Sequence, residues 1–131
     1  MEARAILKNS PFPERKMRLL ADVVRNKPVA EALNILSLHK KKLYASYLYR
    51  LIRSAVANWE GKYGEDAPVD IDDLYIKEIR VDKGRVLKRW QTAPRGMPRP
   101  IRKRFSHITV VVAPMTPVPV SEETENTETE E

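Results

Sequence analysis

The chain has 131 residues, of which 42% are hydrophobic and 32% are charged, and its formal charge at pH 7 is +6. This length predicts one domain with a modest core, or one such domain with a tail. The absence of cysteine excludes disulfides, thiolate metal sites and a cysteine nucleophile. No apolar run approaches the roughly 20 residues that cross a bilayer. The first residues resemble neither a signal peptide nor a transit peptide, so we expect a cytoplasmic protein with no membrane partner.

The charge is divided unevenly along the chain. All 24 Lys and Arg lie at or before Arg104, whereas six of the 18 acids fall in the last ten residues. Residues 1–121 therefore combine 24 cations with 12 acids, a surplus of +12. So large a surplus on a small body repels itself unless a polyanion neutralises it. Nucleic acid is the first candidate partner, and an anionic membrane surface is the second.

The N-terminal part predicts an edge strand and two short helices. Residues 3–8 form the candidate strand, and residues 9–13 form a breaker cluster with two prolines. Pro13 and Pro28 suit the first turns of the two helices, and Asn26 suits a left-handed cap between them. The apolar positions of these helices recur at helical spacing: Met17, Leu20, Ala21 and Val24, then Val29, Ala32, Leu33 and Leu36.

The third helix has the clearest pattern. It should run from about Lys41 to Trp59 or slightly beyond and end near Gly61 or Gly64. Its apolar positions are Leu43, Tyr47, Leu48, Leu51, Ile52, Ala55, Val56 and Trp59. We expect the tyrosines of this helix to pack on the core rather than to form a base-stacking platform. The acidic loop over residues 65–73 lacks the spacing of a calcium loop, so its aspartates should cap and solvate the loop.

Two strands are expected at residues 74–81 and 108–113, where Leu, Ile, Tyr and Val dominate. The segment from Lys83 to Arg104 between them contains no acid. Its nine cations are Lys83, Arg85, Lys88, Arg89, Arg95, Arg99, Arg102, Lys103 and Arg104. Few of its other residues are able to form a core.

Antiparallel pairing of the two strands converts this segment into a hairpin, residues 82–107, called the arm below. Pairing Val81 with Ile108 puts the midpoint between Pro94 and Arg95, where Pro and Gly favour a reversal of the chain. Each leg then has about 12 residues, or roughly 40 Å at 3.3 Å per residue. An isolated basic ribbon is only marginally stable in water, so we expect the arm to be bound to a polyanion. The alternative is a disordered basic linker.

The expected fold class is therefore α+β, with three helices packed on a small antiparallel sheet and a long protruding basic β-hairpin. Residues 1–113 should form a single globular RNA-binding domain that includes the arm. Residues 114–131 are rich in Pro, Thr, Ser and Glu and have the composition of a disordered acidic tail.

Several blocks, in their order and spacing, resemble one known family. They are Arg18–Arg25, Glu31–Leu36, Ser54–Asn58, Asp72–Leu74, Val81–Gly84, Lys88–Arg89 and Arg104–Val112. The chain resembles the bacterial large-subunit ribosomal protein family twenty-two. The resemblance implies a structural constituent of the large subunit, located in the cytoplasm within the ribosome, that binds large-subunit (23S) ribosomal RNA and supports assembly. It also implies an arm whose tip lines the nascent-peptide exit tunnel beside the family-four tunnel protein, in contact with the nascent polypeptide and neighbouring proteins.

The candidate interface combines the arm with basic positions on the helices. The expected RNA-binding residues are Arg15, Lys16, Arg18, Arg25, Lys40, Lys41, Lys42, Lys83, Arg85, Lys88, Arg89, Arg99, Arg102, Lys103, Arg104 and His107. The expected tunnel-tip residues are Trp90, Gln91, Thr92, Ala93, Pro94, Arg95, Gly96 and Met97. Family members often have a basic residue where Met97 stands, and aliphatic residues where Trp90 and Gln91 stand. Trp90 offers a ring that could stack on an unpaired base.

Two other functions remain open at this point. A DNA-bending architectural protein also uses basic β-arms with proline at the tip, although such proteins are normally dimers of smaller subunits. An enzyme acting on RNA would need a convergent acid, base or metal set, and the two histidines show no such pattern. We therefore expect no catalytic residue, no metal site and no cofactor, and a hydrogen-bonding role for His107.

Overall fold

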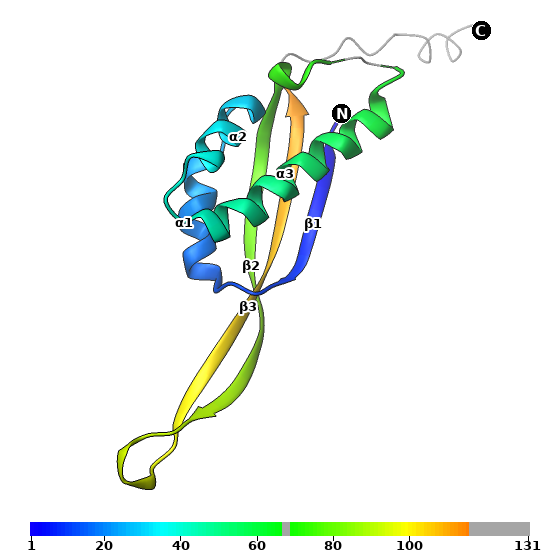
Figure 1. Cartoon of the computed structure of the whole chain (residues 1–131). Helices are drawn as coiled ribbons and strands as arrows, with labels where there is room; N and C mark the ends of the chain where they lie inside the picture. Colours follow the sequence, from blue (N-terminus) through cyan, green and yellow to red (C-terminus); the bar gives the residue numbers. More distant parts are fainter. Residues whose placement is uncertain (67–68, 116–131) are drawn as a thin grey trace, which may run out of the picture.

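The computed structural model describes residues 1–66 and 69–115, and three helices in it lie on one face of an antiparallel sheet (Figure 1). The elements are β1 (Ala3–Ser10), α1 (Glu14–Val24), α2 (Val29–Ser37), α3 (Lys42–Tyr63), β2 (Leu74–Gln91) and β3 (Arg99–Pro114). Short 3-10 turns occur at Ile71–Asp73 and Pro94–Gly96. The α+β class with three helices on a small antiparallel sheet is confirmed.

β3 is the central strand of the sheet, whose strand order is β1-β3-β2. The expected pairing of Val81 with Ile108 is present, and Ala3 lies opposite Val112 on the other side. Ile108, Val110 and Val112 are completely buried under the helices. β-branched residues fit this half-buried pleated surface well, which explains why the run of Ile and Val forms the centre of the sheet.

The two ends of the predicted sheet differ from expectation. β1 continues beyond the expected residue 8 to Ser10, which pairs with Ser106 after a bulge. Asn9 permits this bulge because it adopts φ 56°, a left-handed conformation that Asn tolerates better than most residues. β3 runs to Pro114, which lies opposite Leu74. The tail predicted from residue 114 lies, from residue 116 onward, outside the described residues.

The first two helices follow the sequence pattern. Pro13 and Pro28 occupy their N-cap positions, and the expected apolar positions of α1 are all buried. Asn26 has φ 60°, as its left-handed cap requires. Its N–H donates to the carbonyl of Ile76 at 3.2 Å, which ties the connection between α1 and α2 to the outer edge of β2.

α3 matches its predicted extent and is followed by Gly64. In its first turn, however, the residue that faces the core differs from the predicted one. Leu43 was expected on the apolar face, whereas 62% of its surface is exposed. The inward position of this turn belongs to Ala45, which lies three residues before the buried Leu48. The prediction for Leu43 was wrong. Residues on one face of a helix lie three or four positions apart, and Leu43 lies five positions before the buried Leu48, whereas Ala45 lies three positions before it.

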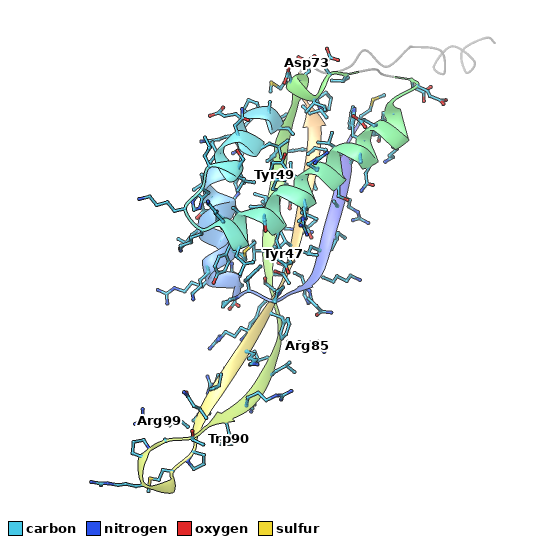
Figure 2. All side chains as sticks on the ribbon, viewed as in Figure 1. Tyr47, Tyr49, Asp73, Arg85, Trp90 and Arg99 are labelled. Atoms are coloured by element: carbon cyan, nitrogen blue, oxygen red, sulfur yellow. The ribbon has the colours of Figure 1, made fainter. Side chains whose placement is uncertain are left out.

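Aromatic rings close the core at the end of the head from which the arm leaves. The ring of Phe12 lies 4.4 Å from that of Tyr44 and 4.9 Å from that of Tyr47, measured between centroids. Both tyrosines and Tyr49 are partly buried against the core, which confirms that the tyrosines of this helix pack on the core. Figure 2 shows Tyr47 close to the start of the arm.

Candidate nucleic-acid interface

The arm is formed by β2 and β3, which continue past the helices as a ribbon of two strands (Figure 1). Their Cα partners run without interruption from Val86 opposite Arg104 to Gln91 opposite Arg99. β1 pairs with β3 only as far as Ser106, so the ribbon has no third strand beyond that point. No residue from Lys83 to Arg104 is fully buried. The side chains of the ribbon are therefore open to a partner.

A bulge at the base of the arm shifts the register by one residue. A constant sum of residue numbers pairs Val86 with Lys103, whereas the observed partner is Arg104. The shift occurs between Lys83 and Val86, where β2 has one residue more than β3. A β-bulge of this kind bends the strand and increases its twist. An unbroken ladder places the midpoint of the hairpin between Pro94 and Arg95, whereas the bulge places it at Arg95.

Gly84 makes this bulge sterically possible. A Cβ atom on Gly84 would lie 2.8 Å from the carbonyl oxygen and 2.9 Å from the carbonyl carbon of Phe105. It would also lie 3.2 Å from the backbone nitrogen of Ser106. All three neighbours are backbone atoms of the partner strand, which cannot rotate away as a side chain can. Only a residue without a side chain fits this close approach.

The chain reverses in a loop over residues 92–98. Pro94–Gly96 forms a 3-10 turn in which Arg95 has φ 64° and Gly96 has φ 70°. Glycine suits this left-handed conformation because it has no Cβ atom. Trp90 and Gln91, which were expected at the tip, belong to β2 and pair with Pro100 and Arg99. The other expected tip residues, 92–97, lie in the loop itself.

The arm carries strong positive charge that the head does not neutralise. Eight of its nine cations between Lys83 and Arg104 are exposed, and Arg104 is half-buried. Within residues 1–66 and 69–115, the four ion pairs all lie outside this segment. The one described cation–π contact in the arm places Arg85 over Phe105, 5.1 Å from the ring centroid. Such unneutralised guanidinium and ammonium groups are suited to phosphate contacts.

Two of the expected RNA-binding arginines, Arg18 on α1 and Arg25 directly after it, have partners within the protein. Arg18 donates through Nε and Nη2 to the carbonyl of Val81, at 3.3 and 3.2 Å. Arg25 donates to the carbonyl of Ile79 at 3.2 Å and pairs with Asp22 at 2.6 Å. β2 is an edge strand, and such contacts satisfy its free carbonyls. The arginines thus protect the edge of the sheet, a role that the sequence pattern did not reveal.

The remaining expected cations of the head stay exposed. Arg15 and Lys16 lie on the outer side of α1. Lys40 and Lys41 lie in the connection that leads into α3, and Lys42 is the first residue of that helix. The ring Nδ1 of His39 accepts a hydrogen bond from the N–H of Lys41 at 3.1 Å. Figure 1 shows this connection on the head, away from the loop of the arm. The structure therefore presents two separate groups of cations.

Arg50 and Arg53 are exposed cations that the sequence reasoning missed. Both lie on the outer face of α3, and the guanidinium of Arg53 lies 5.9 Å from the centroid of the Tyr49 ring. The helical period contained the signal, because both residues fall between the buried positions Leu48 and Ala55 without belonging to the apolar stripe. A basic outer face of α3 thus extends the group at residues 40–42.

His107 has a structural hydrogen bond at the base of the arm. Its Nδ1 accepts the backbone N–H of Asn9 at 3.1 Å, which joins the end of β1 to β3. In the part of the chain that the structure describes, no three His, Asp or Glu side chains are grouped as metal ligands. None of the described helices is both long and apolar enough to span a bilayer.

Comparison with known proteins identifies the family. The family model described as ribosomal protein L22p/L17e matches residues 5–113. A protein of Christiangramia forsetii named large ribosomal subunit protein uL22 is 48% identical over 110 residues, which cover 84% of this chain and 80% of the relative. The protein of the same name from Syntrophotalea carbinolica is 48% identical over 112 residues, which cover 86% of this chain and 97% of the relative.

A third relative of that name, from Cytophaga hutchinsonii, is 48% identical over 127 residues, which cover 93% of this chain and 69% of the relative. The family match includes the whole of the arm and nearly the whole sheet. The resemblance inferred from the sequence blocks is thereby confirmed. The chain belongs to the ribosomal protein L22p/L17e family.

Proposed function

We propose that this protein is a structural constituent of the large ribosomal subunit and binds the ribosomal RNA of that subunit through its arm. The observation that carries the proposal is the projecting ribbon itself. It has nine cations between Lys83 and Arg104, no acid in that segment and, among the described residues, no ion pair. RNA phosphates supply the missing negative charge, and RNA surrounding the ribbon replaces the core that it lacks.

The family and the shape of the arm support finer assignments, which are part of the same proposal. The loop over residues 92–98 lines the nascent-peptide exit tunnel, where the nascent polypeptide and the family-four tunnel protein are its neighbours. The cations of the head, at positions 15, 16 and 40–42, contact RNA at the surface of the subunit. By holding separate RNA segments together, the head and the arm support assembly of the subunit. Arg50 and Arg53 join this set.

The competing functions are less well supported. The family is one of ribosomal proteins that have a structural role, and the protein is not an enzyme. A DNA-bending role would need a dimer in which two arms grip one duplex, whereas the family to which this chain belongs is one of ribosomal proteins. The relatives are bacterial, and bacterial ribosomes work in the cytoplasm, so the protein is cytoplasmic.

Co-sedimentation tests the proposal. The full-length protein, expressed with a tag in bacteria, should remain with the large subunit after a high-salt wash. Replacing Lys88 and Arg102 by Gln should release a larger fraction, because the arm loses two phosphate contacts. Replacing Lys27 and Lys62, two head cations outside the proposed interface, should leave retention unchanged. Wild-type protein that washes off completely, or that sediments with the small subunit, would contradict the proposal.

A further inference from the structure

The two faces of the arm carry different side chains. Residues directly opposite one another in an antiparallel ladder share a face, and neighbours along a strand alternate between faces. The pairs Val86/Arg104, Lys88/Arg102 and Trp90/Pro100 therefore form one face, here called the Trp90 face. The opposite face consists of the pairs Leu87/Lys103, Arg89/Ile101 and Gln91/Arg99.

Trp90 is presented on its face as an open aromatic surface. Its exposed fraction is 70%, whereas the other tryptophan, Trp59, is 1% exposed in the core. Among the described residues, no aromatic ring or cation stacks on the Trp90 indole. Its cross-strand partner Pro100 is small and itself exposed. Figure 2 shows Trp90 on the ribbon just before the loop.

An exposed aromatic residue alone carries little information, since single exposed apolar side chains are common. The side chains that neighbour Trp90 on the same face indicate which kind of partner its ring binds. Lys88 and Arg102 form the next pair toward the head, about 6.6 Å away at the rise of two strand residues, and Arg104 follows. An aromatic platform beside a row of cations is the arrangement with which proteins hold single-stranded nucleic acid.

The geometry points to the Trp90 face as a binding site for one unpaired nucleobase of ribosomal RNA. The base stacks on the indole of Trp90, and the adjoining phosphates contact Lys88 and Arg102. This inference rests on the proposed function and adds to it a ligand class for a particular face of the arm. It also assigns different partners to neighbouring parts of the arm: Trp90 contacts RNA, whereas the loop over residues 92–98 faces the tunnel.

A nascent peptide is the other partner that an exposed indole at this position would suit. The charge of the Trp90 face favours RNA, because its three cations have no carboxylate partner among the described residues. A peptide of arbitrary sequence gives no reason for a row of cations beside the aromatic ring, whereas every nucleotide carries a phosphate next to its base.

Binding of full-length protein to a transcript of large-subunit ribosomal RNA tests the site. Trp90→Ala should weaken binding by about 5- to 150-fold, the range for losing one stacked aromatic side chain. Trp90→Phe should recover part of this loss. Leu87→Ala, on the opposite face of the ribbon, is the matched control and should stay close to wild type. The emission of the buried Trp59 reports in each Trp90 variant that the head is folded.

The dependence on salt separates stacking from charge. Trp90→Ala should lower the affinity without changing the slope of log affinity against log salt. The double change Lys88→Gln and Arg102→Gln should make that slope shallower by about 1.4 to 1.8, because each lost phosphate contact removes roughly 0.7 to 0.9. A Trp90→Ala variant that binds as tightly as wild type overturns the inference, and so does one that changes only the slope.

Photocrosslinking supplies the positional evidence. In subunits assembled with bromouridine-substituted RNA, Trp90 should crosslink to RNA. Crosslinks from Trp90 to the nascent chain in translating ribosomes, with none to RNA, would overturn the inference in favour of the peptide. Wild-type protein that fails to bind the transcript above a non-ribosomal competitor contradicts the proposed function instead. Normal binding without any effect of Trp90 contradicts the Trp90 site alone.

Discussion

The bulge at Gly84 leads to a prediction in which two glycine substitutions have opposite effects. Gly84→Ala places a Cβ atom 2.8 Å from the carbonyl oxygen of Phe105 and 2.9 Å from its carbonyl carbon. Real Cβ atoms do not approach so closely, and the obstacle is backbone held in the ladder between β2 and β3. The strands must separate locally or the register must slip.

The expected size of the effect follows from two opposing terms. Overpacking of this kind costs about 1 to 3 kcal/mol. Replacing Gly by Ala also lowers the conformational entropy of the unfolded chain, which stabilises the folded protein by about 0.4 to 1 kcal/mol. Gly84→Ala should therefore lower the free energy of unfolding by about 1.3 kcal/mol at the midpoints of the two ranges, and by about 2.6 kcal/mol at most. In Gly61→Ala, where the new Cβ meets no atom within 4 Å in α3, only the favourable term applies, and stability should rise by about 0.5 to 1 kcal/mol.

Urea denaturation of the two variants beside wild type measures both changes. Because the bulge also sets the direction in which the arm leaves the head, Gly84→Ala should weaken binding to large-subunit ribosomal RNA, whereas Gly61→Ala should not. If both alanines stabilise the protein equally, the close approach at Phe105 does not constrain the strand, and the account of the bulge is wrong.

Three further predictions concern the edge of the sheet, the arm and the tail. Arg18→Ala removes the hydrogen bonds to the carbonyl of Val81 and should lower the free energy of unfolding by about 1 kcal/mol. If the urea concentration at half unfolding is unchanged, water replaces the guanidinium at this carbonyl. Amide exchange in the free protein should be fast from Lys83 to Arg104, where no residue is fully buried, and slow at Val110; uniform protection would contradict this. Truncation at Val120 removes the six glutamates of residues 122–131, whose negative charge competes with RNA for the cations of the body at low salt. It should raise non-specific RNA affinity at low salt and change little at physiological salt, whereas identical low-salt curves would rule out this competition.

Much of the fold was predictable because its signals are local and strong. Pro13 and Pro28 mark helix starts by their missing N–H groups, and Asn26 marks a left-handed turn. The apolar stripe of α3 predicted its length, although Leu43 was assigned to the wrong face. The first turn of a helix has few neighbours in the pattern, so one apolar residue there can be misassigned.

The candidate interface was predictable in its location and less so in its details. The acid-free segment from Lys83 to Arg104 indicated the arm by composition alone. The bulge at Gly84 was not visible, because it depends on how closely two backbones approach. The use of Arg18 and Arg25 at the edge of β2 was also hidden, since it joins residues 63 and 54 positions apart. Sequence patterns report on one element at a time, and these contacts lie between elements.

The central claim is that unneutralised cations of the arm hold ribosomal RNA, and the salt dependence of binding tests it most directly. The measurement compares full-length wild type with a variant in which four arm cations are replaced by Gln: Lys88, Arg89, Arg102 and Lys103. The slope of log affinity against log salt should become shallower by about 3 in the variant, since each phosphate contact contributes roughly 0.7 to 0.9. Equal slopes for the two proteins would show that the arm does not contact phosphates and would contradict the account.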